Sequence, residues 1–229
     1  MHRLLVYLTT LFLSLVSTGF SESAVSVRTL AVGGDPMPEL FIQTREGYVP
    51  LIFSPVQPGH VGAVTAARTL PVFRKSDSGE ADFEILERLK LPRETKGILV
   101  LGWKSKEATK LVAVSDDFSK AGFSDWLLIN ASSRAVAFKA GDGAKPLLLK
   151  AGVSCTHRVA AEKGKGVAVT AGALLKGRSR VFYSTFWPAF ADKRNVVVFV
   201  DDGERILVKR ISDELPSKKD EVSGNQHQQ

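Results

Sequence analysis

The sequence predicts an all-β protein built from two consecutive small β-sandwich modules. After residue 24 the apolar residues fall in short runs separated by turn residues, and they do not keep helical spacing over long windows. A similar order of runs and turns occurs twice along the chain, which favours an internal duplication. With 44% hydrophobic and 24% charged residues, the 229-residue chain has an ordinary globular composition, so we expect each module to bury a core.

The first segment, residues 1–23, has the layout of a secretory signal peptide. Arg3 ends a short positive start, Leu4–Val16 is mostly apolar, and several small residues follow, which leaves the exact cleavage bond open. Because a membrane-spanning helix needs roughly 20 apolar residues, this stretch is too short to be an anchor. We therefore expect export to the periplasm or the extracellular space, with no transmembrane anchor after signal cleavage.

The rest of the chain divides into two modules and a linker. Module 1 covers residues 24–117 with a leading strand, residues 118–124 form the linker, and module 2 covers residues 125–214. Residues 215–229 are polar and charged, and we expect a disordered tail there. The strands are expected at residues 26–32, 39–44, 47–53, 70–75, 97–103, 109–115, 126–130, 134–139, 146–150, 155–160, 166–172, 180–187, 195–201 and 205–211.

One further stretch, residues 83–91, is ambiguous. Its apolar residues fit one face of a helix or one face of a strand. Pro92 follows directly, so a helix would be very short, and a strand is favoured.

The predicted duplication depends on two matched hairpins. Residues 39–53 align without gaps with residues 125–139, and each segment reads as strand, polar turn, strand. Residues 97–103 and 111–117 match segments that begin 98 and 97 positions later, in the same order. We therefore expect the two modules to superpose on these segments.

This pattern of strands and turns over residues 39–214 resembles that of secreted bacterial proteins built from paired immunoglobulin-like β-sandwich modules. The resemblance includes no diagnostic motif. It implies a sandwich fold without implying an activity.

Candidate catalytic residues are few. Alternation along a strand would place Cys155 and His157 on one face, where they could form a nucleophile and its base or half of a metal site. A buried, inert thiol is the more common arrangement. The carboxylate pairs Asp116-Asp117 and Asp213-Glu214 read as strand exits, because adjacent strand residues point to opposite faces. We predict no catalytic residue, no metal and no cofactor.

Binding residues are expected in module 2. Two basic turns could lie together at one end of the sandwich and attract an anionic polymer by charge, with solvated turns as the alternative. The next stretch is the most aromatic of the chain, and two of its residues share a face that could stack on a sugar or pack between the modules. These candidate residues are Lys163, Lys165, Lys176, Arg178, Arg180, Tyr183 and Trp187.

The function predicted from the sequence is binding or structural contact by an exported, non-enzymatic protein of the bacterial envelope or extracellular space. A net charge of +7 favours an anionic glycan of the envelope as partner, with an unknown protein as the other choice and no specific nucleic acid. One alternative is a small secreted hydrolase that uses Cys155 and His157. Another is a periplasmic chaperone-like protein that adds a strand to a client.

Overall fold

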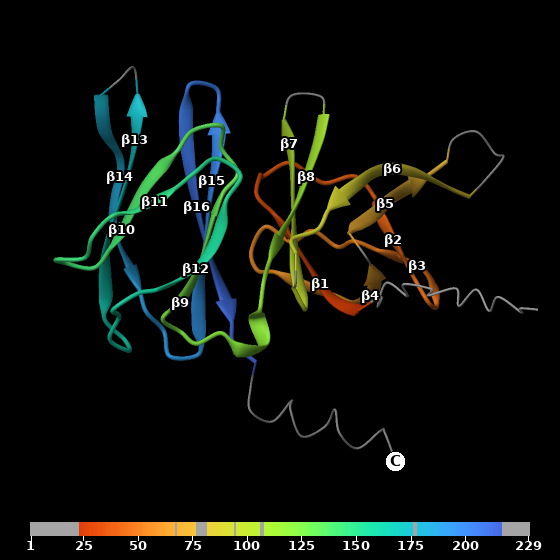
Figure 1. Cartoon of the computed structure of the whole chain (residues 1–229), viewed down its shortest axis with the longest axis horizontal. Coiled ribbons are helices and arrows are strands. Elements are labelled where there is room, and N and C mark those ends of the chain that lie inside the picture. The colour runs from red at the N-terminus through yellow and green to blue at the C-terminus, as the bar shows by residue number, and fades with distance from the viewer. Residues whose placement is uncertain are drawn as a thin grey trace, which may run out of the picture.

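The computed structural model describes residues 23–66, 68–76, 82–93, 95–105, 108–175 and 178–216 (Figure 1). Almost all of the predicted signal peptide and most of the predicted tail, residues 217–229, lie outside the described residues. The described residues form strands and one short 3-10 helix, which confirms the predicted all-β class.

Each module contributes eight strands in this part of the chain. Those of module 1 are β1 (Ser23–Ala31), β2 (Phe41–Thr44), β3 (Gly47–Pro50), β4 (Gly59–Ala66), β5 (Thr69–Lys75), β6 (Phe83–Lys90), β7 (Gly97–Ser105) and β8 (Ala108–Ser115). The 3-10 helix η1 (Phe118–Lys120) follows. Those of module 2 are β9 (Asp125–Asn130), β10 (Val136–Ala140), β11 (Leu147–Leu149), β12 (Ser154–Arg158), β13 (Gly166–Leu175), β14 (Arg178–Pro188), β15 (Lys193–Asp202) and β16 (Arg205–Glu214). The ambiguous stretch is therefore the strand β6.

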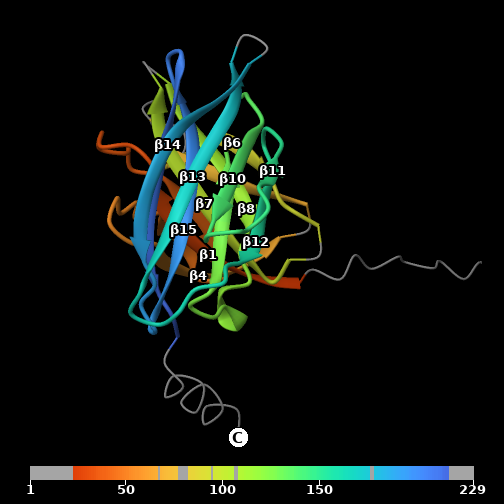
Figure 2. The same ribbon diagram turned by 90° about the vertical axis from the view of Figure 1, so that its left-hand side faces the viewer.

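Four four-stranded sheets are stacked as layers, two in each module (Figure 1). We call β4-β1-β7-β8 and β12-β9-β15-β16 the inner sheets, because they face each other across the molecule, and β3-β2-β5-β6 and β11-β10-β13-β14 the outer sheets. Figure 2 looks onto the outer sheet of module 2. The fold is thus two β-sandwiches packed together through their inner sheets, while the immunoglobulin-like kinship stays a prediction.

The two modules repeat one topology strand by strand. In each inner sheet the first strand lies parallel to the seventh, as β1 pairs with β7 and β9 with β15. In each outer sheet the last strand, β6 or β14, carries a bulge. The two bulges lie opposite equivalent residue pairs of the neighbouring strand, Val72/Phe73 in β5 and Ala171/Gly172 in β13. Strand βn of module 1 therefore corresponds to βn+8 of module 2.

This correspondence corrects one of the two predicted hairpin matches. Residues 39–53 contain the hairpin β2–β3, whereas residues 125–139 span β9 and β10, which lie in different sheets. The prediction was wrong because a hairpin and a crossing between sheets share the same apolar, turn, apolar pattern. The second match needs a correction of one residue. Val100 pairs with Ala113 in module 1 as Val197 pairs with Arg210 in module 2, so β7 and β15 are related by a shift of 97 positions, as β8 and β16 are, and not by 98.

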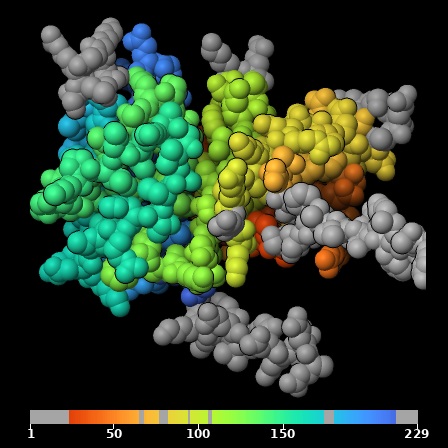
Figure 3. All heavy atoms as spheres, viewed as in Figure 1, coloured from red at the N-terminus to blue at the C-terminus, as the bar shows by residue number. Residues whose placement is uncertain are grey.

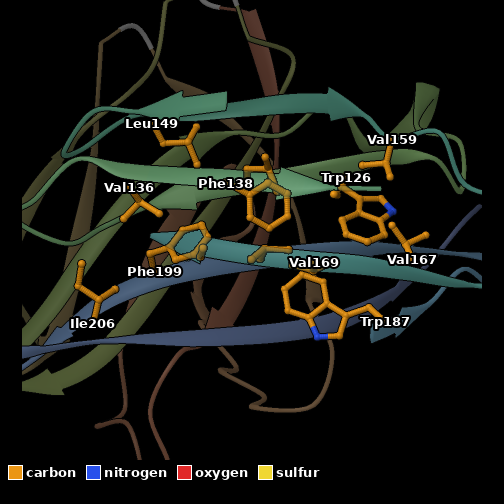
Figure 4. Packing of buried hydrophobic residues seen from close by; sticks show 14 of the residues in the cluster. Trp126, Val136, Phe138, Leu149, Val159, Val167, Val169, Trp187, Phe199 and Ile206 are labelled. Atoms are coloured by element: carbon orange, nitrogen blue, oxygen red, sulfur yellow. The ribbon is translucent and has the colours of Figure 1, made fainter. Parts of the chain in front are cut away.

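Three apolar clusters hold the layers together. One fills each sandwich, and Figure 4 shows the aromatic cluster of module 2. The third lies between the inner sheets and includes Leu30, Leu99, Leu127, Val196 and Val198. Figure 3 shows the atoms of module 2 lying directly against those of β7 and β8. Strands β7 and β15 are buried on both faces, which explains their nearly continuous apolar sequences.

Candidate functional site

Four charged side chains are buried at one end of the interface between the inner sheets. Arg28, Asp116, Arg194 and Asp213 each expose 3% or less of their side chains, and we call them the junction charge cluster. Arg28 holds Asp213 with two hydrogen bonds, Nη1 to Oδ1 at 3.0 Å and Nη2 to Oδ2 at 2.7 Å. Arg194 donates from Nε to Asp213 at 3.0 Å and from Nη2 to Asp116. Two of these ion pairs, Arg28–Asp213 and Arg194–Asp116, cross between the modules.

The two acids of the junction charge cluster occupy equivalent positions in the two modules, whereas the two arginines do not. Asp116 and Asp213 occupy equivalent positions, because Asp116 bonds to the backbone of Gly97 and Asp213 pairs with Arg194 in the same register. Arg194 therefore corresponds to Gly97. Arg28 corresponds to Leu127, because Arg28 and Leu127 lie opposite equivalent residues of β7 and β15. Only two arginines are thus available to the two acids, and the buried charges cancel.

Phe118 of η1 covers the cluster. The Arg28 guanidinium carbon lies 3.7 Å from the centroid of its ring, and that of Arg194 lies 5.1 Å away. A cation over an aromatic face is attracted by the negative potential of the ring. The predicted linker therefore contributes a side chain to the junction.

A pocket of about 640 Å³ opens over the cluster. Arg28, Asp116 and Asp213 are its buried charged lining residues, which we call its floor, and Phe118 also lines it. The remaining lining comes from the start of β1, the loop before β4, the start of β7 and the end of β16, so both modules contribute. We treat this junction pocket as the candidate site, because ligand pockets are frequent at module interfaces.

His60 lies on the pocket wall next to the charge cluster. It is the register partner of Arg28 on β4, and its ring centroid lies 5.7 Å from that of Phe118. Although His60 is exposed at its outer edge, partial burial lowers the pKa of its imidazole, the positive charge of Arg28 lowers it further, and Asp213 and Asp116 oppose these effects. These effects together favour the neutral imidazole over the imidazolium.

Among the described residues, the side chains of Cys155 and His157 make no hydrogen bond to a group that could act with them in catalysis. Both lie on β12 and pair with Leu128 and Trp126 of β9, and Cys155 packs against the module 2 core. Burial raises the pKa of the Cys155 thiol, which reduces the reactive thiolate. Within the described ranges, no three His, Cys, Asp or Glu side chains gather as a metal cluster.

The prediction that the basic turns form one patch is wrong. Lys163 and Lys165 precede β13, whereas Arg178 and Arg180 follow it, at the other end of a ten-residue strand about 30 Å long. Lys165 also pairs with Glu162 at 2.5 Å. Lys176 lies outside the described residues. The sequence places both turns in module 2, but strand β13 keeps them apart.

The aromatic candidates pack inside module 2, not between the modules. Trp187 exposes only 5% of its surface and lies against Trp126 and Phe138 in the core. Its Nε1 donates a hydrogen bond to the hydroxyl of Tyr183 at 3.2 Å. Trp187 is buried and Tyr183 is half-buried, whereas Val181 and Phe186 are the exposed apolar side chains of this strand, so the predicted sugar platform of Tyr183 and Trp187 is not open to a ligand.

The residues of the junction pocket were missed by sequence reasoning. Arg28 is the one charged residue of a strand otherwise made of apolar and hydroxyl residues, which is a signal of a buried charge with a partner. From the sequence, Asp116 and Asp213 were interpreted as strand exits. Their shared role as partners of arginines becomes visible only when the inner sheets are packed together. The sequence offers His60 only as one of its four histidines, and nothing in it marks Phe118.

No known protein-family model matches this chain, and no curated protein matches it. In the part of the chain that the structure describes, no helix has the length and apolar character needed to cross a membrane. The site is therefore interpreted from its own geometry.

Proposed function

We propose that the protein is an exported, non-catalytic binding protein whose ligand occupies the junction pocket. The observation that carries this proposal is the pocket itself, whose volume of about 640 Å³ falls in the range of small-molecule sites. Its floor is held by charge-assisted hydrogen bonds between the two modules, from Arg28 to Asp213 and from Arg194 to Asp116, so it is preorganised before a ligand arrives. A preformed site loses little free energy to ordering on binding.

The groups around the pocket favour binding over catalysis. Among the described residues, His60 makes no hydrogen bond to a hydroxyl or carboxylate that it could activate or that could orient it. The carboxylates of Asp116 and Asp213 are both occupied by arginines. These contacts leave neither a nucleophile with its base nor a free pair of acids.

The strand-adding alternative would use the free edge of β14. This edge is eleven residues long and exposes Val181 and Phe186. The bulge at β13–β14 interrupts its ladder, and Arg180 adds a charge, and both features protect edges from pairing. We therefore place binding at the pocket first.

The proposal is tested with ligand-induced thermal stabilisation of the exported protein against a library of small polar molecules. A ligand at 100 times its Kd stabilises the folded state by about 2.7 kcal/mol. Ser26→Tyr places a large side chain into the pocket, and Ser184→Tyr, on the exposed face of β14, is the matched control.

We expect at least one compound class to raise the Tm of the unmodified protein and of Ser184→Tyr, but not of Ser26→Tyr. No stabilisation by any compound, or equal stabilisation of the two variants, would contradict the proposed site. Export is checked separately, by cell fractionation of the chain with and without residues 1–23. Retention of the full chain in the cytoplasm would contradict that part.

A further inference from the structure

We infer that the ligand of the junction pocket is a neutral, hydroxyl-rich molecule of the saccharide class. This inference rests on the proposed function, since it names the ligand class of the same pocket. It follows from three properties of the lining: the buried charges are already paired, the free polar groups other than Lys96 are neutral donors and acceptors, and one wall is aromatic.

The floor of the pocket offers no free charge. Each carboxylate of the junction charge cluster lies against both arginines, so the four charges cancel before a ligand enters. A ligand with a carboxylate or phosphate would approach Arg28 only in competition with Asp213, which holds it through two hydrogen bonds. A ligand amine would meet the same competition at Asp213.

The acids at the rim are also paired. Asp117 lies 3.7 Å from Lys120, and Glu214 lies 3.3 Å from Lys193. Lys96 has no ion-pair partner within the described residues, but one exposed lysine beside these carboxylates is a weak attraction for an anion. The pocket therefore selects neither sign of charge strongly.

The unbonded polar groups of the pocket are suited to hydroxyls. Ser26, Gln57 and His60 line it, and their side chains make no hydrogen bond to the described residues. The serine hydroxyl, the amide and a neutral imidazole each both donate and accept. A molecule with several hydroxyl groups, each a donor and an acceptor, satisfies all three.

The apolar wall is suited to the carbon face of a sugar ring. Phe118 is half-buried, with the Arg28 guanidinium over its ring, and it lines the pocket together with Pro58 and Leu215. Aromatic rings combine a large apolar face with defined geometry, and the C–H face of a pyranose packs on such a surface.

The experiment is a titration by NMR or calorimetry with probes of matched size. The neutral probes are cellobiose, maltose and the N-acetylglucosamine disaccharide; the anionic probe is the galacturonic acid disaccharide, and the cationic probe is the glucosamine disaccharide. We expect a neutral disaccharide to bind the exported protein at least tenfold more tightly than the charged ones. Its affinity should change little between low salt and 0.5 M salt, because no net charge is involved.

Matched variants locate the contact. Gln57→Ala should weaken binding of the neutral probe about fivefold to tenfold, the loss of one hydrogen bond. Gln43→Ala, on the exposed face of β2, is the control and should leave binding unchanged. Ser26→Tyr should abolish binding.

Three outcomes test this inference together with the proposed function. If only charged or non-saccharide compounds bind, and Ser26→Tyr blocks them, the saccharide class is wrong and the pocket remains the site. If no probe and no library compound binds at the pocket, both proposals fail. Neutral saccharide binding that survives Ser26→Tyr places the sugar elsewhere and overturns the inference.

Discussion

The two modules share one topology but place their aromatic residues on opposite faces of the outer sheet. Phe41 and Ile42 of β2 correspond to Ala137 and Phe138 of β10, as the pairing with β5 and β13 shows. In module 1 the aliphatic residue is buried and Phe41 points outward. In module 2 the aromatic residue is buried and Ala137 points outward.

The outer face of module 1 is covered by its own aromatic cluster. Tyr48 stacks on Phe83 at a centroid distance of 4.0 Å and meets Phe73 edge-on at 4.9 Å. Phe73 is consequently only 7% exposed, although it lies on the outside of the sheet. In module 2 the equivalent position is Gly172, which has no side chain to cover the outer face of the sheet there.

The cores show the opposite arrangement. Module 2 fills its core with Trp126, Phe138, Trp187 and Phe199 (Figure 4). The position of Phe199 is Gly102 in module 1, where a Cβ would lie 2.6 Å from Met37 and 2.7 Å from Phe53. Different side chains thus fill the same backbone, which shows that strand order and total volume, more than particular core residues, define this sandwich.

The largest expected effect tests this exchange of faces. Phe138→Ala should lower the free energy of unfolding by about 3–5 kcal/mol, because it leaves a cavity in the core of module 2. Phe41→Ala, at the neighbouring outward position of module 1, should cost about 1 kcal/mol, because the side chain is only partly buried. Chemical denaturation measures both. Equal losses would contradict the comparison.

The second prediction concerns the equivalent acids. Asp213→Asn should destabilise the protein by about 3 kcal/mol, because it leaves two arginines buried with one carboxylate. Asp116→Asn should have a similar effect, since it occupies the same position in module 1. Arg74→Met, which breaks the exposed pair with Glu84, is the control and should cost less than about 1 kcal/mol. A small loss in only one of the two acid variants would show that the cluster is not shared between the modules.

The sequence was sufficient for most strands and for the repetition, because alternation and turn residues are local signals. It did not predict β4 (Gly59–Ala66), whose glycines and alanines give only a weak apolar pattern. It failed where local signals are the same for different topologies, as for residues 125–139, and where the bulge beside Phe182 interrupts the alternation of β14. The junction pocket could not be predicted from the sequence, for a physical reason. Arg28 and Asp213 are 185 positions apart, and they meet only because the inner sheets pack face to face.

The third prediction explains why module 1 has no arginine at the position of Arg194. A Cβ on Gly97 would lie 2.2 Å from the backbone oxygen of Asp116, so any larger residue pushes β7 away from the segment that carries this acid. Gly97→Ala should cost about 1–3 kcal/mol, a loss typical of overpacking. Gly34→Ala, with no atom within 4 Å of its Cβ, should change stability by less than about 0.5 kcal/mol. Thermal denaturation compares the two, and an unperturbed Gly97→Ala would contradict the role of this contact.

The smallest expected effect is the pH dependence of stability that arises from His60, which has no histidine at the equivalent position of module 2. His60 corresponds to Thr156, because Arg28 pairs with His60 as Leu127 pairs with Thr156. Burial and the charge of Arg28 lower the pKa of His60 below its usual 6.5, so the unfolded chain binds a proton at a higher pH than the folded chain does. The stability linked to this group is therefore complete above pH 6.5 and is lost as the pH falls towards the folded pKa. His60→Thr, which installs the module 2 residue, should reduce the loss of stability between pH 7 and pH 5 measured by urea denaturation. Parallel profiles for the variant and the unmodified protein would show that the fall in stability comes from other groups.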